Sequence, residues 1–153
     1  MTPRSFLKYW LPVVAWMIFI FIGSTDLMSA EHTSRFIVPF LLWLKPDMSP
    51  ETIARIHMLI RKLGHVTEYG ILAALSWRAL RARIFSQREL MKPAMIVLLI
   101  SASYAALDEF HQSFIPTRTA SENDVLIDVC GGCIGLVLCF ALNRVRARQA
   151  RTT

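Results

Sequence analysis

Four apolar segments constrain this sequence more than any motif does. They cover residues 6–23, 63–80, 93–110 and 125–142, and each approaches the ~20 residues that a helix needs to cross a hydrocarbon core of ~30 Å. No apolar–polar alternation recurs, which disfavours a β-barrel. The composition agrees, with 54% hydrophobic and 18% charged residues. We therefore predict an all-α integral membrane protein, a four-transmembrane-helix bundle whose single domain covers residues 1–153.

The first loop, residues 24–62, contains its own helix signals. Ser34–Pro46 is apolar but too short to span a membrane, which predicts an interfacial or re-entrant helix in this outer loop. Ser49 then precedes Pro50, a pair typical of an N-cap followed by the first helical position. We expect the helix that begins there to continue without a break into the second span.

The distribution of charge predicts the orientation. With a cytoplasmic N-terminus, the inner surfaces hold eleven basic residues and one acidic residue, whereas the outer surfaces hold six basic and ten acidic residues. Because cytoplasmic loops are enriched in Lys and Arg, both termini should be cytoplasmic in a multi-pass protein of the bacterial cytoplasmic (inner) membrane. This orientation accounts for the net charge of +6, so nucleic acid is not an expected partner. The sequence does not indicate an oligomeric state.

The fourth segment contains "CGGC" at residues 130–133, which has the spacing of a redox motif. It lies inside an apolar helix, where we interpret it as small-residue packing. Gly131 and Gly135 also form a GxxxG spacing, which lets another helix approach closely.

This topology brings polar residues from three spans to the same outer depth. They are Arg61, Lys62, His65, Glu68 and Tyr69 at the second span, Asp108, Glu109, His111 and Gln112 at the third, Arg118 in the loop, and Asp124 and Asp128 at the fourth. Helical spacing places them on shared faces. Ionisable groups at membrane depth are costly and usually mark a functional site.

Two of these stretches, "RKLGHVTEYGILAAL" and "ALDEFHQSFIPTRTASENDVLIDVCGGCIG", resemble the VanZ-like family of small bacterial membrane proteins. The resemblance covers the last three spans. The chain departs from the family pattern at Thr117, where glycine is frequent, and at Asp128, where asparagine is also common. The family's name-giving member is associated with teicoplanin resistance, so the resemblance implies that this chain lowers susceptibility to that lipoglycopeptide antibiotic.

Our first hypothesis is an outward-facing site that binds or remodels an amphiphilic or lipid-linked ligand of the outer leaflet. Membrane lipids are the other expected partners. Arg61, Lys62 and Arg118 would bind an anionic head group. Nearby carboxylates would hold these basic side chains in place, and a divalent metal is a candidate ion for the same carboxylates. The predicted ligand-binding residues are Arg61, Lys62, His65, Glu68, Tyr69, Asp108, Glu109, Gln112, Arg118, Asp124 and Asp128.

The alternative is a membrane-embedded enzyme acting on a lipid-linked phosphate or glycan. Its candidate catalytic residues are His65, Glu68, Glu109 and His111, although no established catalytic signature is present. His65 and Glu68 lie three residues apart, which fits half of a metal site or a salt bridge equally well. A third interpretation is a non-catalytic salt-bridge network that fixes helix register.

Overall fold

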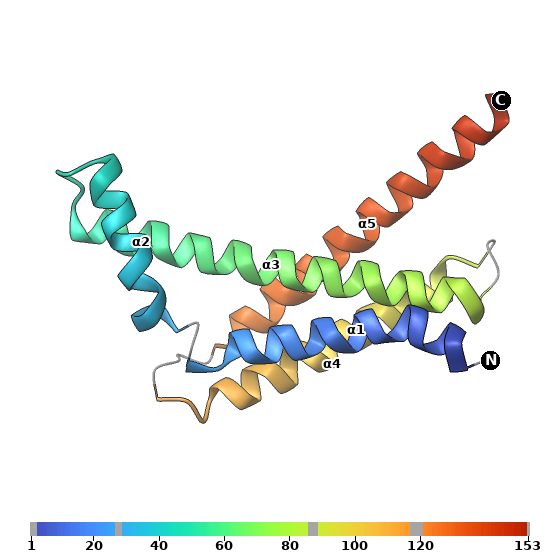
Figure 1. Cartoon of the computed structure of the whole chain (residues 1–153), viewed down its shortest axis with the longest axis horizontal. Coiled ribbons are helices and arrows are strands. Elements are labelled where there is room, and N and C mark those ends of the chain that lie inside the picture. The colour runs from blue at the N-terminus through green and yellow to red at the C-terminus, as the bar shows by residue number, and fades with distance from the viewer. Residues whose placement is uncertain (1–2, 27–28, 86–88, 117–120, 153) are drawn as a thin grey trace.

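The computed structural model describes residues 3–26, 29–85, 89–116 and 121–152 (Figure 1). These ranges contain the helices α1 (Pro3–Ser24), α2 (Ala30–Leu44), α3 (Pro50–Arg83), α4 (Met91–Gln112) and α5 (Glu122–Thr152). No strand occurs among the described residues, so the predicted all-helical class is confirmed.

Three helices in the described part of the chain are long and apolar enough to cross a membrane. Their apolar stretches are Phe6–Ser24 of α1, Met91–Gln112 of α4 and Asn123–Ala150 of α5. The predicted span at residues 63–80 lies within α3 and is not among them, because polar side chains such as Glu68 and Arg78 interrupt its apolar residues. Three of the four predicted spans are thus found.

The outer faces of these three helices expose large apolar side chains. Ile18 of α1, Leu99 of α4 and Val137 of α5 each remain at least half exposed. Extensive exposed apolar surface is unusual on a soluble monomer and is typical of a surface that contacts lipid.

Helix α3 begins where the sequence predicts. The Ser49 side chain accepts a hydrogen bond from the Thr52 backbone N–H, and Pro50 occupies the first turn. The helix then runs unbroken for 34 residues, or about 50 Å at 1.5 Å per residue. The expected continuity from the first loop into residues 63–80 is therefore confirmed.

Helix α2 replaces the shorter helix predicted at residues 34–46. It starts earlier because the Ser29 side chain caps it by accepting from the His32 backbone N–H. Among the described helices α2 contacts only α3, and the Thr33 hydroxyl lies 2.9 Å from His57 Nε2 at this contact.

Helix α3 also packs against α1, α4 and α5, and its most extensive contact is with α5 (Figure 1). Glycines allow this contact: a Cβ added to Gly131 would lie 2.9 Å from Val66 Cα, and one added to Gly135 would lie 2.9 Å from Gly70 Cα. Cys130 and Cys133 are exposed free thiols. The interpretation of this stretch as small-residue packing is confirmed for its two glycines, Gly131 and Gly132.

The helices define two ends of the bundle. The last turns of α1 and α4 and the first turns of α5 lie at one end (Figure 1), which we call the polar end. These turns contain Ser24, Gln112 and Asp124. The first turns of α1 and α4 and the last turns of α3 and α5 lie toward the other end (Figure 1), which we call the basic end because α3 and α5 carry Arg78 and Arg146 in this direction.

Candidate functional site

Three side chains from two helices form a buried hydrogen-bonded group at the polar end. The Ser24 hydroxyl of α1 donates to Asp108 Oδ2 of α4 over 2.6 Å. Gln112 Nε2 donates to the same Oδ2 over 3.0 Å and to Ser24 Oγ over 3.1 Å. All three residues are buried, with Asp108 only 4% exposed. Hydrogen bonds to a carboxylate are among the stronger ones in proteins, so this group fixes the end of α1 against α4.

A second buried carboxylate joins α3 to α5. Asp128 is 1% exposed, and its Oδ1 lies 3.1 Å from His65 Nδ1. A neutral imidazole with its proton on Nδ1 would donate to this carboxylate and leave Nε2 as an acceptor. The structure thus pairs His65 with Asp128 of another helix, 63 residues away in the chain.

Two buried oxygens beside these groups have no hydrogen-bond partner among the described residues. They are the hydroxyl of Tyr69, which is fully buried, and Oδ1 of Asp108. Tyr69 lies within electrostatic range of both Asp108 and Asp128. An unsatisfied buried polar group costs about 1–3 kcal/mol, so a hydrogen bond from a ligand or water molecule to either oxygen would recover free energy.

Helix α1 is held over this region by two backbone carbonyls. Trp16 Nε1 donates to the carbonyl oxygen of Glu68 over 2.8 Å, and the Tyr104 hydroxyl donates to the carbonyl oxygen of Met17 over 2.5 Å. The Glu68 side chain extends to α1 as well, and its Oε1 would lie 3.8 Å from a Cβ added to Gly23.

Glu109 and His111 both lie at the end of α4, but their side chains have different neighbours. Glu109 Oε1 accepts a hydrogen bond from the Ser121 backbone N–H, which ties the start of α5 to α4. The His111 ring packs on Phe21 with centroids 4.5 Å apart, and its Nδ1 is buried without a partner among the described residues. Neither residue lines the cavities described next.

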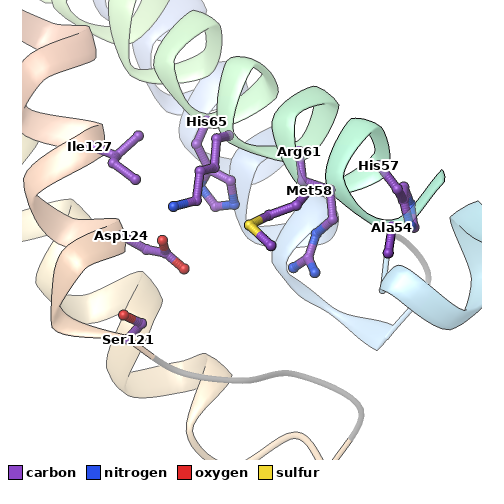
Figure 2. Close-up of a pocket in the computed structure, with 9 residues that line it drawn as sticks. Ala54, His57, Met58, Arg61, His65, Ser121, Asp124 and Ile127 are labelled. Carbon is purple, nitrogen blue, oxygen red and sulfur yellow. The ribbon is translucent and has the colours of Figure 1, made fainter. Parts of the chain in front are cut away.

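A charged cavity of about 400 Å³ opens between α3 and α5 at the polar end (Figure 2). Arg61, Lys62 and His65 line it from α3, and Asp124 lines it from α5 (Figure 2). Among the described residues, neither Arg61 nor Lys62 forms an ion pair. Their charges therefore face a cavity in which Asp124 is the one acidic residue among the described lining residues, and it does not form an ion pair with either.

An apolar cavity of about 450 Å³ adjoins the charged one between α1, α2 and α3. Arg61 and His65 line both cavities, whereas Phe19, Ile22 and Ile37 give the second one its apolar walls. The two cavities together offer charged groups beside an apolar volume, with the shared side chains at the boundary.

His57 lies at the far end of the charged cavity, near α2. The Thr33 hydroxyl already donates to the Ser29 carbonyl oxygen over 2.8 Å, so Thr33 accepts from His57 Nε2–H. Partial burial, and secondarily the nearby Arg61 charge, lower the pKa of His57 from its ordinary value of 6.5. The neutral ring is therefore the favoured form at neutral pH.

A comparison with protein families matches the model of the family described as VanZ/LLP1 to residues 9–143. The chain belongs to the VanZ/LLP1 family. The match includes α4 and every helix segment that contributes to the two cavities. With its three apolar helices, this VanZ-like chain is a membrane protein. Comparisons with curated proteins and with solved structures find no significant match.

The structure divides the predicted site residues of this VanZ/LLP1 chain into groups. Arg61, Lys62, His65 and Asp124 surround the charged cavity. Tyr69, Asp108, Gln112 and Asp128 form the buried polar layer beside it. Arg118 lies outside the described residues. No group of three or more His, Cys, Asp or Glu side chains with metal-site geometry occurs in the described ranges.

Sequence reasoning missed Ser24, Thr33 and His57 as contributors. Ser24 ends an apolar span and carries no spacing signal toward Asp108, 84 residues later. His57 did fall on the helical stripe that contains Arg61 and His65, and this spacing was the one signal that could have identified it.

Proposed function

We propose that this VanZ/LLP1 protein binds an amphiphile with an anionic head group from the outer leaflet of the bacterial cytoplasmic membrane. The observation that carries the proposal is the sharing of Arg61 and His65 by a charged and an apolar cavity. In this arrangement the head group contacts Arg61 and Lys62, whose donors suit phosphate oxygens, and an acyl or prenyl chain occupies the apolar cavity beside α2.

The proposal includes a membrane placement. Helix α3 crosses the bilayer in addition to α1, α4 and α5, which makes four spans. Helix α2 lies in or re-enters the outer interface, and both termini are cytoplasmic. The charge distribution supports this orientation. The buried Asp128 supports the inclusion of α3, because this carboxylate is shielded from lipid and hydrogen-bonded to His65 of α3. The chain acts as one domain over residues 1–153.

The ligand class can be tested with purified protein in zwitterionic nanodiscs. A polyprenyl phosphate, dioleoyl phosphatidylcholine and glycerol 3-phosphate serve as probes, and bound copies are counted by native mass spectrometry. We expect binding of the polyprenyl phosphate and little binding of the other two, because the site requires both a charge and a chain. Glycerol phosphate binding as tight as the lipid would refute the role of the apolar cavity.

Two variants on one helix assign the binding to the cavity. Arg61→Gln removes a cavity cation and should weaken polyprenyl phosphate binding about tenfold, which corresponds to about 1.4 kcal/mol. Arg55→Gln is the matched control, since Arg55 is exposed, pairs with Glu51 over 2.6 Å and lines neither cavity. Equal binding by both variants would contradict the proposal. Teicoplanin is a further candidate ligand, and loss of a susceptibility difference in Arg61→Gln cells would link the site to resistance.

A second candidate function rests on the hydrogen bond between His65 and Asp128. A carboxylate that fixes the imidazole leaves Nε2 available as a general base beside the charged cavity. The protein would then hydrolyse or transfer a lipid-linked phosphate. Turnover that is lost in His65→Ala and reduced in Asp128→Asn, with lipid binding retained, would favour this enzyme over a binding protein. Absence of turnover by the wild type with any divalent metal would count against it.

A further inference from the structure

A second charged cavity lies between α3 and α5 at the basic end of the bundle. It has a volume of about 300 Å³, and three arginines line it, Arg78 and Arg81 from α3 and Arg146 from α5. Asn143 adds an amide, and Trp77 and Leu142 add apolar surface. None of these residues belongs to the cavities at the polar end.

The packing of α3 and α5 produces this cavity. The two helices are closest where Gly70 meets Gly131 and Gly135, and past that crossing α5 diverges from α3 (Figure 1). The edge of the Trp77 ring packs against Phe140 with centroids 4.9 Å apart, which fills the narrow part between the helices. The arginines lie beyond this aromatic pair, where the helices separate.

Protein contacts position two of the arginines. The Arg78 guanidinium lies 5.7 Å from the centre of the Tyr9 ring, and that of Arg81 lies 4.9 Å from the centre of the Trp77 ring. Arg81 also donates to the backbone carbonyl oxygen of Glu89 over 3.3 Å. Stacking on the Tyr9 ring holds the Arg78 guanidinium in place while its donors stay available to a ligand.

The charge in this cavity has no acidic complement from the cavity walls. In the described part of the chain neither Arg78 nor Arg146 forms an ion pair. Glu89 is the one acidic residue on this side of the predicted topology, and its Oε1 lies 3.5 Å from Lys92 Nζ. The cavity therefore concentrates positive charge between two helices, one of which is a candidate span.

We propose that this cavity binds the phosphate of an anionic phospholipid in the leaflet at the basic end. Guanidinium groups bind phosphate oxygens in a bidentate manner, and basic cavities between membrane helices on the cytoplasmic side suit such head groups. Trp77 and Leu142 would contact the glycerol and the first methylenes. The site is separate from the proposed amphiphile site and would anchor the diverging arms of α3 and α5.

The test compares two double variants with the same change of charge. Arg78→Gln with Arg146→Gln removes two cavity arginines, one from α3 and one from α5. Arg144→Gln with Arg148→Gln removes two exposed arginines of α5 that do not line the cavity. Native mass spectrometry counts dioleoyl phosphatidylglycerol bound to delipidated protein, with dioleoyl phosphatidylcholine as the neutral probe. We expect an affinity loss of about tenfold or more in the cavity variant and at most a few-fold loss in the control.

Two outcomes would overturn the proposal. An equal loss in both double variants would show diffuse attraction to the basic surface and no cavity site. Competition by inorganic phosphate at the concentration that phosphatidylglycerol itself requires would assign the cavity to a free phosphate. Circular dichroism and melting of each variant establish that it is folded. The loss in the cavity variant should be the same in an Arg61→Gln background, which separates this cavity from the site at the polar end.

Discussion

Replacing Gly135 by alanine tests the close contact between α3 and α5. The added Cβ would lie 2.9 Å from both the carbonyl carbon and Cα of Gly70, and closer still to its carbonyl oxygen. All three are backbone atoms, so no side chain can rotate away to make room. The substitution must therefore push α3 and α5 apart or slide one along the other.

The magnitude follows from the size of that displacement. Ordinary contacts begin at 3.4 Å, and the shortest contact, with the Gly70 carbonyl oxygen, requires α3 to retreat by about 1 Å. A gap of that size forfeits about half of the dispersion attraction along the contact. Overpacking of this kind costs about 1–3 kcal/mol. The intrinsic helix propensity of alanine offsets about 1 kcal/mol. Because every clashing atom belongs to the backbone, the cost falls in the upper part of that range, about 2–3 kcal/mol, which leaves a net loss of about 1–2 kcal/mol in the free energy of unfolding.

Gly64→Ala is the matched control on α3. A Cβ added at Gly64 meets no heavy atom within 4 Å, so this variant should keep the propensity gain and be as stable as the wild type or more stable. Thermal melting in one detergent, followed by circular dichroism, measures both. With about 2–4 °C per kcal/mol for a chain of this size, Gly135→Ala should melt several degrees lower. Melting of Gly135→Ala at or above the wild-type temperature would refute the glycine-dependent contact.

Two further predictions concern the polar end. Ser24→Ala removes the hydroxyl that donates to Asp108 Oδ2, and it should lower the free energy of unfolding by about 1–3 kcal/mol. The control Ser113→Ala, at an exposed residue, should melt like the wild type. A melting temperature of Ser24→Ala equal to that of the wild type would contradict the importance of this contact. The pKa of His57 is lowered from 6.5 mainly by burial, so the unfolded chain takes up the proton first and stability falls as pH drops from about 6.5 toward the lower pKa of the folded chain. His57→Gln should lose that part of the decline in melting temperature, and a pH profile identical to the wild type would refute it.

Features that depend on a few neighbouring residues were predictable from the sequence. The apolar stretches of α1, α4 and α5 can be read from the sequence of each segment. A helix makes its backbone hydrogen bonds along its own length, so it needs no distant segment in order to form. The start of α3 is similarly local, because the Ser49 side chain needs only the N–H of Thr52 three residues later. The close approach at Gly131 and Gly135 was also predictable, as only glycine leaves such space.

The pairing of polar side chains was not predictable. Helical spacing offered Glu68 as the natural neighbour of His65, but the structure brings Asp128 of α5 to its Nδ1. Ser24 joins Asp108 from another helix, and His111 turns to Phe21 away from the cavities. Such pairs depend on how far each helix is rotated and shifted against its neighbours, and the spacing within one helix contains no information on that.

The sequence by itself therefore determined that this chain forms apolar membrane helices and that polar residues of several helices gather at one end, because segment length, periodicity and charge count are properties of each segment. Only the tertiary structure decided that Arg61 and His65 stand between a charged and an apolar cavity, and that α3 and α5 separate beyond their glycines to leave Arg78 and Arg146 around a third. Cavities arise where packed helices diverge, and that divergence is set by contacts between residues far apart in the chain.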